Sequence, residues 1–156
     1  MLNGANTVRN STAKRRAMAR LYKYRSFVHG KMNSQSYLDL PVYQLAFNAA
    51  MQIFEISKTF PADEQFSLTD NIRRSSRSVC ANLVQAWCKR RYEDEFVVKL
   101  NDLEAEVSET QTLLDFAVKC GYINPEINRD INQSYKQILE ALVNMIKNPS
   151  LWLMWY

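Results

Sequence analysis

Residues 68–87 read LTDNIRRSSRSVCANLVQAW, and this stretch carries the clearest indication of the fold. At about 100° per residue, its apolar side chains fall within a helical sector roughly 60° wide, while its arginines lie close to the opposite side. This separation is typical of an amphipathic helix that packs in a helical bundle. The apolar stripe consists of Leu68, Ile72, Val79, Leu83 and Ala86, and the small residues that would permit close helix approach are Ser75, Ser76, Ser78 and Ala81.

A first helix is predicted upstream, with Asp39 as its cap, Pro41 in its first turn and Pro61 as its stop. Its apolar residues recur every three and four positions. We expect the second helix to begin with a capping box in which Ser67 is the cap and Asp70 takes the reciprocal place. The stripe of the first helix is Val42, Leu45, Ala49, Ile53, Ile56 and Phe60.

Two further helices are predicted downstream. One runs from about Glu93 to Cys120, and Gly121 follows it as a C-terminal stop. The other opens at Asn124-Pro125 and ends before Pro149. Short connections make consecutive helices antiparallel, so the fold class is all-α, an antiparallel up-down-up-down four-helix bundle. We place the bundle at 37–149, between a basic N-terminal extension at 1–36, either disordered or partly helical, and an aromatic tail at 150–156.

The composition of the 156 residues is that of a soluble globular chain, with 47% hydrophobic and 23% charged residues. No apolar run approaches the roughly 18 residues that cross a bilayer, so no membrane is expected as a partner.

The apolar C-terminus around Trp152 is expected to fold back on the bundle or meet a partner. The cysteines are odd in number and lack metal-ligand spacing, so we expect free, mostly buried thiols in the reducing cytoplasm: Cys80, Cys88 and Cys120.

The net charge of +4 hides a strong asymmetry. Residues 1–35 carry eight of the 20 basic side chains and no acidic one, whereas all 16 acidic groups lie in the remainder. Such an extension can bind polyanions, and its composition also fits a transit peptide, but a solvated tail is the plainer interpretation. Met32 is an alternative start of translation.

The residues available for catalysis are few. His29 is the only histidine and lies outside the predicted bundle, and the three glycines form no phosphate-binding loop. Nucleophilic catalysis and a ferritin-like di-iron site therefore lack their histidines. We expect no enzyme, no metal and no cofactor, and a carboxylate-only active site is the catalytic arrangement that the composition leaves open.

The basic side of the second helix is the candidate nucleic-acid-binding surface. Arginine clusters suit phosphates because the guanidinium group offers a bidentate fork. If the helix continues beyond Trp87, further cations extend this row to about 27 Å at 1.5 Å per residue. The alternative is an ordinary solvated helix face. The candidate residues are Arg73, Arg74, Arg77, Lys89, Arg90 and Arg91.

An acidic row lies on one flank of the third helix. Like charges spaced by four positions repel each other mildly, so a basic row beside the acidic row would offset this electrostatic repulsion. That basic row could belong to the same protomer or to a neighbouring subunit, and a solvated face or a metal site are the alternatives. The row contains Glu95 together with the candidate subunit-interface residues Asp102, Glu106 and Glu109.

Several short motifs resemble the bacterial four helix bundle protein family, whose founding members are encoded by intervening sequences in 23S ribosomal RNA genes. The resemblance covers about residues 37–148, and the family is similar to the accessory variability determinant of diversity-generating retroelements. One departure is Val84-Gln85-Ala86, where the family usually has Ala-Glu-Gly. The motifs are Leu40-Pro41-Val42-Tyr43, Phe60-Pro61, Ile72-Arg73-Arg74-Ser75, Ser78-Val79-x-Ala81-Asn82, Gly121-Tyr122-Ile123 and Met145-Ile146-Lys147.

The resemblance implies a homopentamer without enzymatic activity, whose basic surfaces bind nucleic acid and a reverse transcriptase. Carried over by position, Arg73, Arg74 and Arg77 would provide those contacts. Two hypotheses follow. In the first, the bundle is a nucleic-acid-binding accessory protein; in the second, it is a homo-oligomeric scaffold whose basic and acidic rows pair across subunits.

Overall fold

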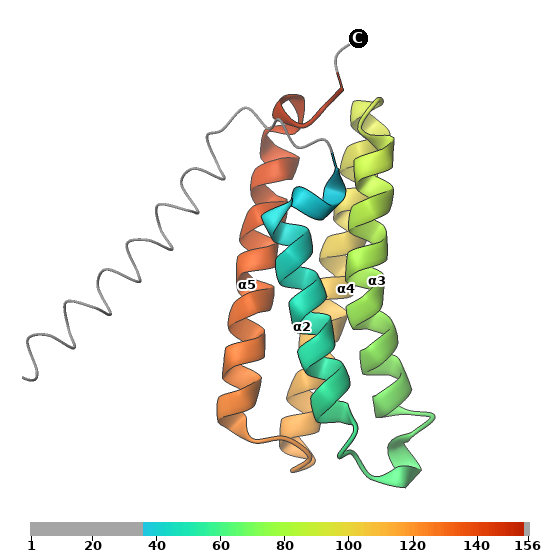
Figure 1. The fold of residues 1–156 in the computed structure, drawn as a ribbon, viewed down its shortest axis with the longest axis vertical. Helices are drawn as coiled ribbons and strands as arrows, with labels where there is room; N and C mark the ends of the chain where they lie inside the picture. Colours follow the sequence, from blue (N-terminus) through green and yellow to red (C-terminus); the bar gives the residue numbers. More distant parts are fainter. Residues whose placement is uncertain (1–35, 155–156) are drawn as a thin grey trace, which may run out of the picture. The chain divides into compact units, whose positions relative to one another are not determined.

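The computed structural model describes residues 36–154, in which four long helices form a four-helix bundle (Figure 1). The helices are α2 (Pro41–Ser57), α3 (Leu68–Lys89), α4 (Glu93–Lys119) and α5 (Pro125–Lys147). Three single-turn 3-10 helices accompany them: η1 (Tyr37–Asp39), η2 (Ala62–Glu64) and η3 (Pro149–Leu151). This part of the chain contains no strand, and the predicted all-α bundle is confirmed.

Each helix packs on the helix before it and the helix after it, so the order around the bundle is α2, α3, α4, α5 and back to α2. The short connections make neighbours antiparallel. The apolar stripes meet on the bundle axis, where the largest side chains are almost completely excluded from solvent. This core includes Ile53, Ile72, Leu83, Phe96, Leu100, Leu103, Leu114, Tyr135, Ile138 and Leu142.

The contact between α3 and α4 involves small residues of the 68–87 stretch. Ser75 is 1% exposed, and its hydroxyl lies 3.0 Å from that of Thr110 on α4, which is itself fully buried. A hydroxyl-sized side chain lets the two helices approach, and the hydrogen bond satisfies the polar atoms that this approach buries. The predicted close approach at Ser75 is therefore confirmed.

Two of the predicted helix ends have the expected chemistry. Gly121, with φ +76°, follows α4, and the amides of Gly121 and Tyr122 donate to the carbonyls of Val118 and Ala117. These two bonds define a Schellman motif, which needs a residue in the left-handed region. At the start of α5, the side chain of Asn124 accepts from the amide of Glu126 at 2.7 Å.

Two other helix starts differ from the prediction. Helix α2 is preceded by the buried Leu40, which gives no side-chain cap, while Asp39 belongs to η1. At α3, Ser67 makes no capping hydrogen bond. Glu64 replaces it, because its carboxylate accepts from the Leu68 amide at 3.1 Å. Local patterns identified where these helices begin, but the path of the preceding turn decided which side chain reaches the free amides.

Glu64 also joins two loops, since its second carboxylate oxygen accepts from the Tyr122 hydroxyl at 3.1 Å. The hydrogen bond from the Leu68 amide is the main reason that the pKa of Glu64 lies below its usual value. A lowered folded-state pKa means that the carboxylate stabilises the fold at neutral pH and that this contribution disappears in acid.

We expect Glu64→Gln to lower the free energy of unfolding at pH 7, because the glutamine amide is uncharged at the positive end of α3. The difference from the wild-type protein should shrink once the pH falls below about 4, where the unfolded carboxyl is protonated. Urea denaturation at both pH values measures this. A difference that stays constant with pH would contradict a role for the charge.

The prediction that the cysteines are mostly buried is wrong, whereas the prediction that they are free thiols is confirmed. Cys88 and Cys120 are exposed and only Cys80 is half-buried, although all three are free thiols. Burial raises the pKa of Cys80 to about 11. Cys88 lies in the last turn of α3, and Cys120 is the residue that follows α4. An apolar residue type does not by itself identify a buried position.

At the C-terminus, Trp152 is 7% exposed, and the amide of Met154 donates to the carbonyl of Arg90 at 3.1 Å. The expectation that this end folds back on the bundle is confirmed for Trp152, whereas Trp155 and Tyr156 lie outside the described residues. Within 36–154, no helix combines the length and hydropathy that a membrane span requires.

Candidate nucleic-acid interface

The α2–α3 side of the bundle carries the predicted arginines. Arg73 is half-buried, and its Nε donates to the hydroxyl of Ser57 on α2 at 2.7 Å. Its guanidinium carbon lies 5.0 Å from the centre of the Phe54 ring. Two contacts to α2 therefore hold this side chain, while the terminal nitrogens of its guanidinium group are not engaged by Ser57.

Two more cations surround the same ring. The guanidinium carbon of Arg77 lies 5.9 Å from the ring centre of Phe54, and the ammonium nitrogen of Lys58 lies 4.7 Å from it. Lys58 also forms an ion pair with Glu55 at 2.8 Å. We call Phe54, Lys58, Arg73 and Arg77 the Phe54 cluster. The negative ring face attracts the three cations, which otherwise repel one another.

Arg74 lies beside the Phe54 cluster on the outer face of α3. It is exposed, and one of its terminal nitrogens donates to the side chain of Asn71 at 2.9 Å. Together with Arg73 and Arg77, it gives the first half of α3 three guanidinium groups within five residues. Such an arrangement can bind several phosphates, and an aromatic ring at its centre can stack on a base.

The three predicted cations at the other end of α3 have different surroundings. The helix ends at Lys89, so Arg90 and Arg91 do not continue the row in helical register, and the predicted 27 Å row is wrong. Lys89 forms an ion pair with Glu95. Arg90 lies over Trp87, with its guanidinium carbon 3.3 Å from the ring centre, and donates to the Trp87 carbonyl. Arg91 is exposed.

The acidic row of α4 does not neutralise the α3 arginines. Asp102 pairs with Lys99 on its own helix at 2.9 Å, and Glu95 pairs with Lys89. In the described part of the chain, Arg73 and Arg77 face α2 and form no ion pair with α4. The remaining interface candidates differ in exposure, with Glu106 half-buried and Glu109 exposed.

The contribution of α2 was missing from the sequence prediction. Phe54 and Lys58 are four residues apart and share a face of α2 with Phe47 and Met51, which are 50% and 45% exposed. This second apolar row lies outside the main stripe of α2, and it is the sequence pattern from which the contribution of α2 could have been predicted. Its position beside Arg73 and Arg77 depends on how α2 packs on α3, which periodicity alone does not specify.

Comparisons with known proteins agree with this architecture. The model of the 23S rRNA-intervening sequence protein family matches residues 38–144, a range that contains the Phe54 cluster. The chain belongs to this family. No curated protein matches this 23S rRNA-intervening sequence family member.

A solved structure also resembles this member of the family. It is a protein of the S23 ribosomal protein family from Bacteroides thetaiotaomicron, described as having unknown function. The sequences are 29% identical, the match covers 68% of this chain and 98% of the other, and the TM-score is 0.61. Neither the family name nor this neighbour points to an enzyme. Within residues 36–154, no group of three His, Cys, Asp or Glu side chains is arranged to hold a metal ion.

Proposed function

We propose that this 23S rRNA-intervening sequence family member binds nucleic acid, with RNA as the expected ligand, through the Phe54 cluster and Arg74. The observation that carries the proposal is the convergence of Lys58, Arg73 and Arg77 on one aromatic ring. Arg73 is held in place by Ser57 before any ligand arrives, so less side-chain entropy is lost when a phosphate binds. The family name, which refers to a ribosomal RNA gene, supports RNA over other polyanions.

Phosphate neutralisation predicts a strong dependence of binding on salt. Each phosphate contact to a single strand contributes about −0.7 to the slope of log K against log[salt], and three contacts contribute about −2. Fluorescence anisotropy with a labelled single-stranded RNA, a DNA of the same sequence and the full chain measures this slope. Because residues 1–35 can also bind polyanions, a steep slope supports the proposal when Arg74→Glu/Arg77→Glu reduces it, and absence of binding at about 50 mM salt overturns the proposal.

A second candidate function is the homo-oligomeric scaffold, and one observation favours it. Phe47 and Met51 are about half exposed on the face of α2 that also carries Phe54, and exposed apolar side chains that lie together are typical of subunit contacts. In this alternative, Asp102, Glu106 and Glu109 of one subunit pair with the basic side of the next. Light scattering and RNA titration of Phe47→Glu separate the two functions. If the particle mass falls while RNA binding is retained, Phe47 forms a subunit contact and RNA binding does not depend on that contact, so the Phe54 cluster keeps nucleic-acid binding as its function.

The proposal also includes two properties implied by the resemblance, which are assembly into a pentamer and a reverse transcriptase as protein partner. A cytoplasmic location, inferred from the cysteines, belongs to it as well. In an oligomer each subunit carries one copy of the Phe54 cluster, and a long RNA that contacts several copies at once would bind with a higher apparent affinity. Comparing a long RNA with a short one therefore tests the assembly and the binding function in a single titration.

A further inference from the structure

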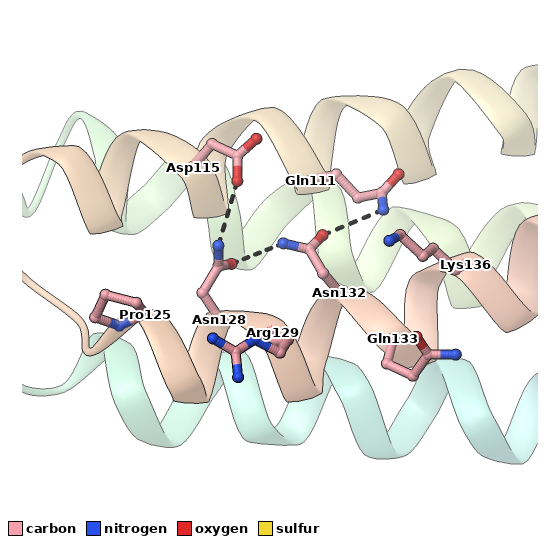
Figure 2. Close-up of a pocket in the computed structure, with 8 residues that line it drawn as sticks. All are labelled: Gln111, Asp115, Pro125, Asn128, Arg129, Asn132, Gln133 and Lys136. Atoms are coloured by element: carbon pink, nitrogen blue, oxygen red, sulfur yellow. Dashed lines mark hydrogen bonds between the residues drawn. The ribbon is translucent and has the colours of Figure 1, made fainter.

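On the opposite side of the bundle, α4 and α5 enclose an open polar groove of about 520 Å³ (Figure 2). Four side chains form a hydrogen-bonded chain along it. Gln111 donates to Asn132 at 3.1 Å, Asn132 donates to Asn128 at 2.8 Å, and Asn128 donates to the carboxylate of Asp115 at 3.3 Å. We call these four residues the amide chain.

Asp115 sets the direction of the whole chain. A carboxylate only accepts hydrogen bonds, so Asn128 must turn its amino group toward Asp115 and its carbonyl toward Asn132. The same reasoning orients Asn132 and Gln111 in turn. Each of the three amino groups keeps a second N–H for a ligand, and the outer oxygen of Asp115 and the carbonyl of Gln111 remain as acceptors.

Two cations border the amide chain. Arg129 follows Asn128 in the sequence, and Lys136 lies one turn beyond Asn132. Arg129 and Lys136 are seven residues apart and therefore lie on the same flank of α5. Both are exposed, and they are about 10 Å apart along the helix, from seven residues at 1.5 Å each. The groove therefore offers a ligand both hydrogen-bond donors and acceptors, and the two cations outweigh the single carboxylate of Asp115.

The lining distinguishes between classes of partner. A protein partner needs apolar anchors, and Pro125 is the one apolar residue that lines this groove. Interfaces with nucleic acids are more polar and more positively charged, and asparagine and glutamine amides form hydrogen bonds to base edges. A groove of amides between two cations matches the second class.

We propose that the groove between α4 and α5 is a second nucleic-acid-binding site, in which Arg129 and Lys136 contact phosphates and the amide chain contacts base edges or sugar hydroxyls. The inference rests on the proposed function, because it assumes nucleic acid as the ligand. It adds a consequence: since the groove lies opposite the Phe54 cluster, one protomer can hold two segments of nucleic acid at once.

The test compares two charge reversals in the full chain. Arg129→Glu/Lys136→Glu alters the groove, and Arg74→Glu/Arg77→Glu alters the α3 side with the same change in net charge. The probe is a labelled single-stranded RNA, and residues 1–35 contribute the same background in every variant. We expect the groove variant to lower affinity at least tenfold and to reduce the magnitude of the salt slope by about 1.4, at about 0.7 for each phosphate contact to a single strand. Because both residues are exposed, its helical circular dichroism should be unchanged; if it is not, Arg129→Gln/Lys136→Gln replaces it.

A second pair of variants tests the amides without changing charge. Gln111→Ala/Asn132→Ala should lower RNA affinity about threefold and leave the salt slope unchanged, because phosphate contacts remain. Gln85→Ala, which removes an exposed amide from α3, is the matched control and should bind like the wild-type protein.

The outcomes separate the two proposals. If only the α3 reversal weakens binding, the groove is not a site and the proposed function stands. If only the groove reversal weakens binding, the groove stands and the Phe54 cluster is not the interface. If RNA does not bind, both proposals are wrong. Binding of polyglutamate that is lost in the groove variant would identify an acidic protein partner and overturn the nucleic-acid assignment of the groove.

Discussion

Arg74→Glu/Arg77→Glu should weaken binding of single-stranded RNA about 100-fold at low salt, which corresponds to about 3 kcal/mol for two charge-assisted contacts. It should also reduce the magnitude of the salt slope by about 1.4, at about 0.7 for each phosphate of a single strand that the variant no longer neutralises. Both side chains are exposed, and among residues 36–154 Arg74 makes a hydrogen bond only to Asn71, one turn away on its own helix. The bundle should therefore stay folded, and anisotropy titrations at several salt concentrations measure the effect.

Arg73 is left unchanged in this variant for a structural reason. Its hydrogen bond to Ser57 links α3 to α2, so its replacement would mix a loss of binding with a change in packing. The control is Lys119→Glu/Lys147→Glu, which alters net charge equally at the exposed ends of α4 and α5. Equal weakening in the control and in the arginine variant would mean that only net charge matters, and it would contradict a localised interface on α3.

Ser75→Leu should destabilise the bundle by about 2–4 kcal/mol. Overpacking a closely packed site costs about 1–3 kcal/mol, and loss of the hydrogen bond to Thr110 adds about 1 kcal/mol. Against a total stability of about 5–15 kcal/mol, this is a large fraction, and it corresponds to a fall in melting temperature of about 10 °C. Thermal and urea denaturation followed by circular dichroism give the two values.

Two comparison variants isolate the cause. Ser75→Ala removes the hydroxyl without adding volume, so it should cost only about 1 kcal/mol. Ser108→Leu adds the same volume at an exposed position of α4 and should change stability by less than about 0.5 kcal/mol. A Ser75→Leu protein as stable as Ser108→Leu would show that Ser75 does not set the distance between α3 and α4.

Much of the fold could be predicted from local signals. The spacing of Ile72, Val79 and Leu83 identified the buried face of α3, and all three are at most 1% exposed. Gly121 and Asn124 marked helix ends correctly because their effects act within a few residues. The prediction for Ser67 was wrong because Glu64, from the preceding turn, reaches the first amide of α3 instead.

The candidate site was only half predictable. The three arginines of α3 were identified from composition and helical phase, and they do gather at one end of that helix. The second half of the basic row was wrong, because α3 ends at Lys89 and the chain turns there. The groove between α4 and α5 could not be predicted, since Asp115 and Gln111 come from one helix and Asn128 and Asn132 from the other.

Four amphipathic helices, their order and most of their ends follow from local patterns, because periodicity and capping act between residues that are close along the chain. How each helix is rotated about its axis relative to its neighbours depends instead on the packing of the whole bundle. That rotation turns Arg73 and Arg77 toward Phe54 on α2 and away from the acidic row of α4. It depends on how all four apolar stripes pack together, so no single stretch of the chain specifies it.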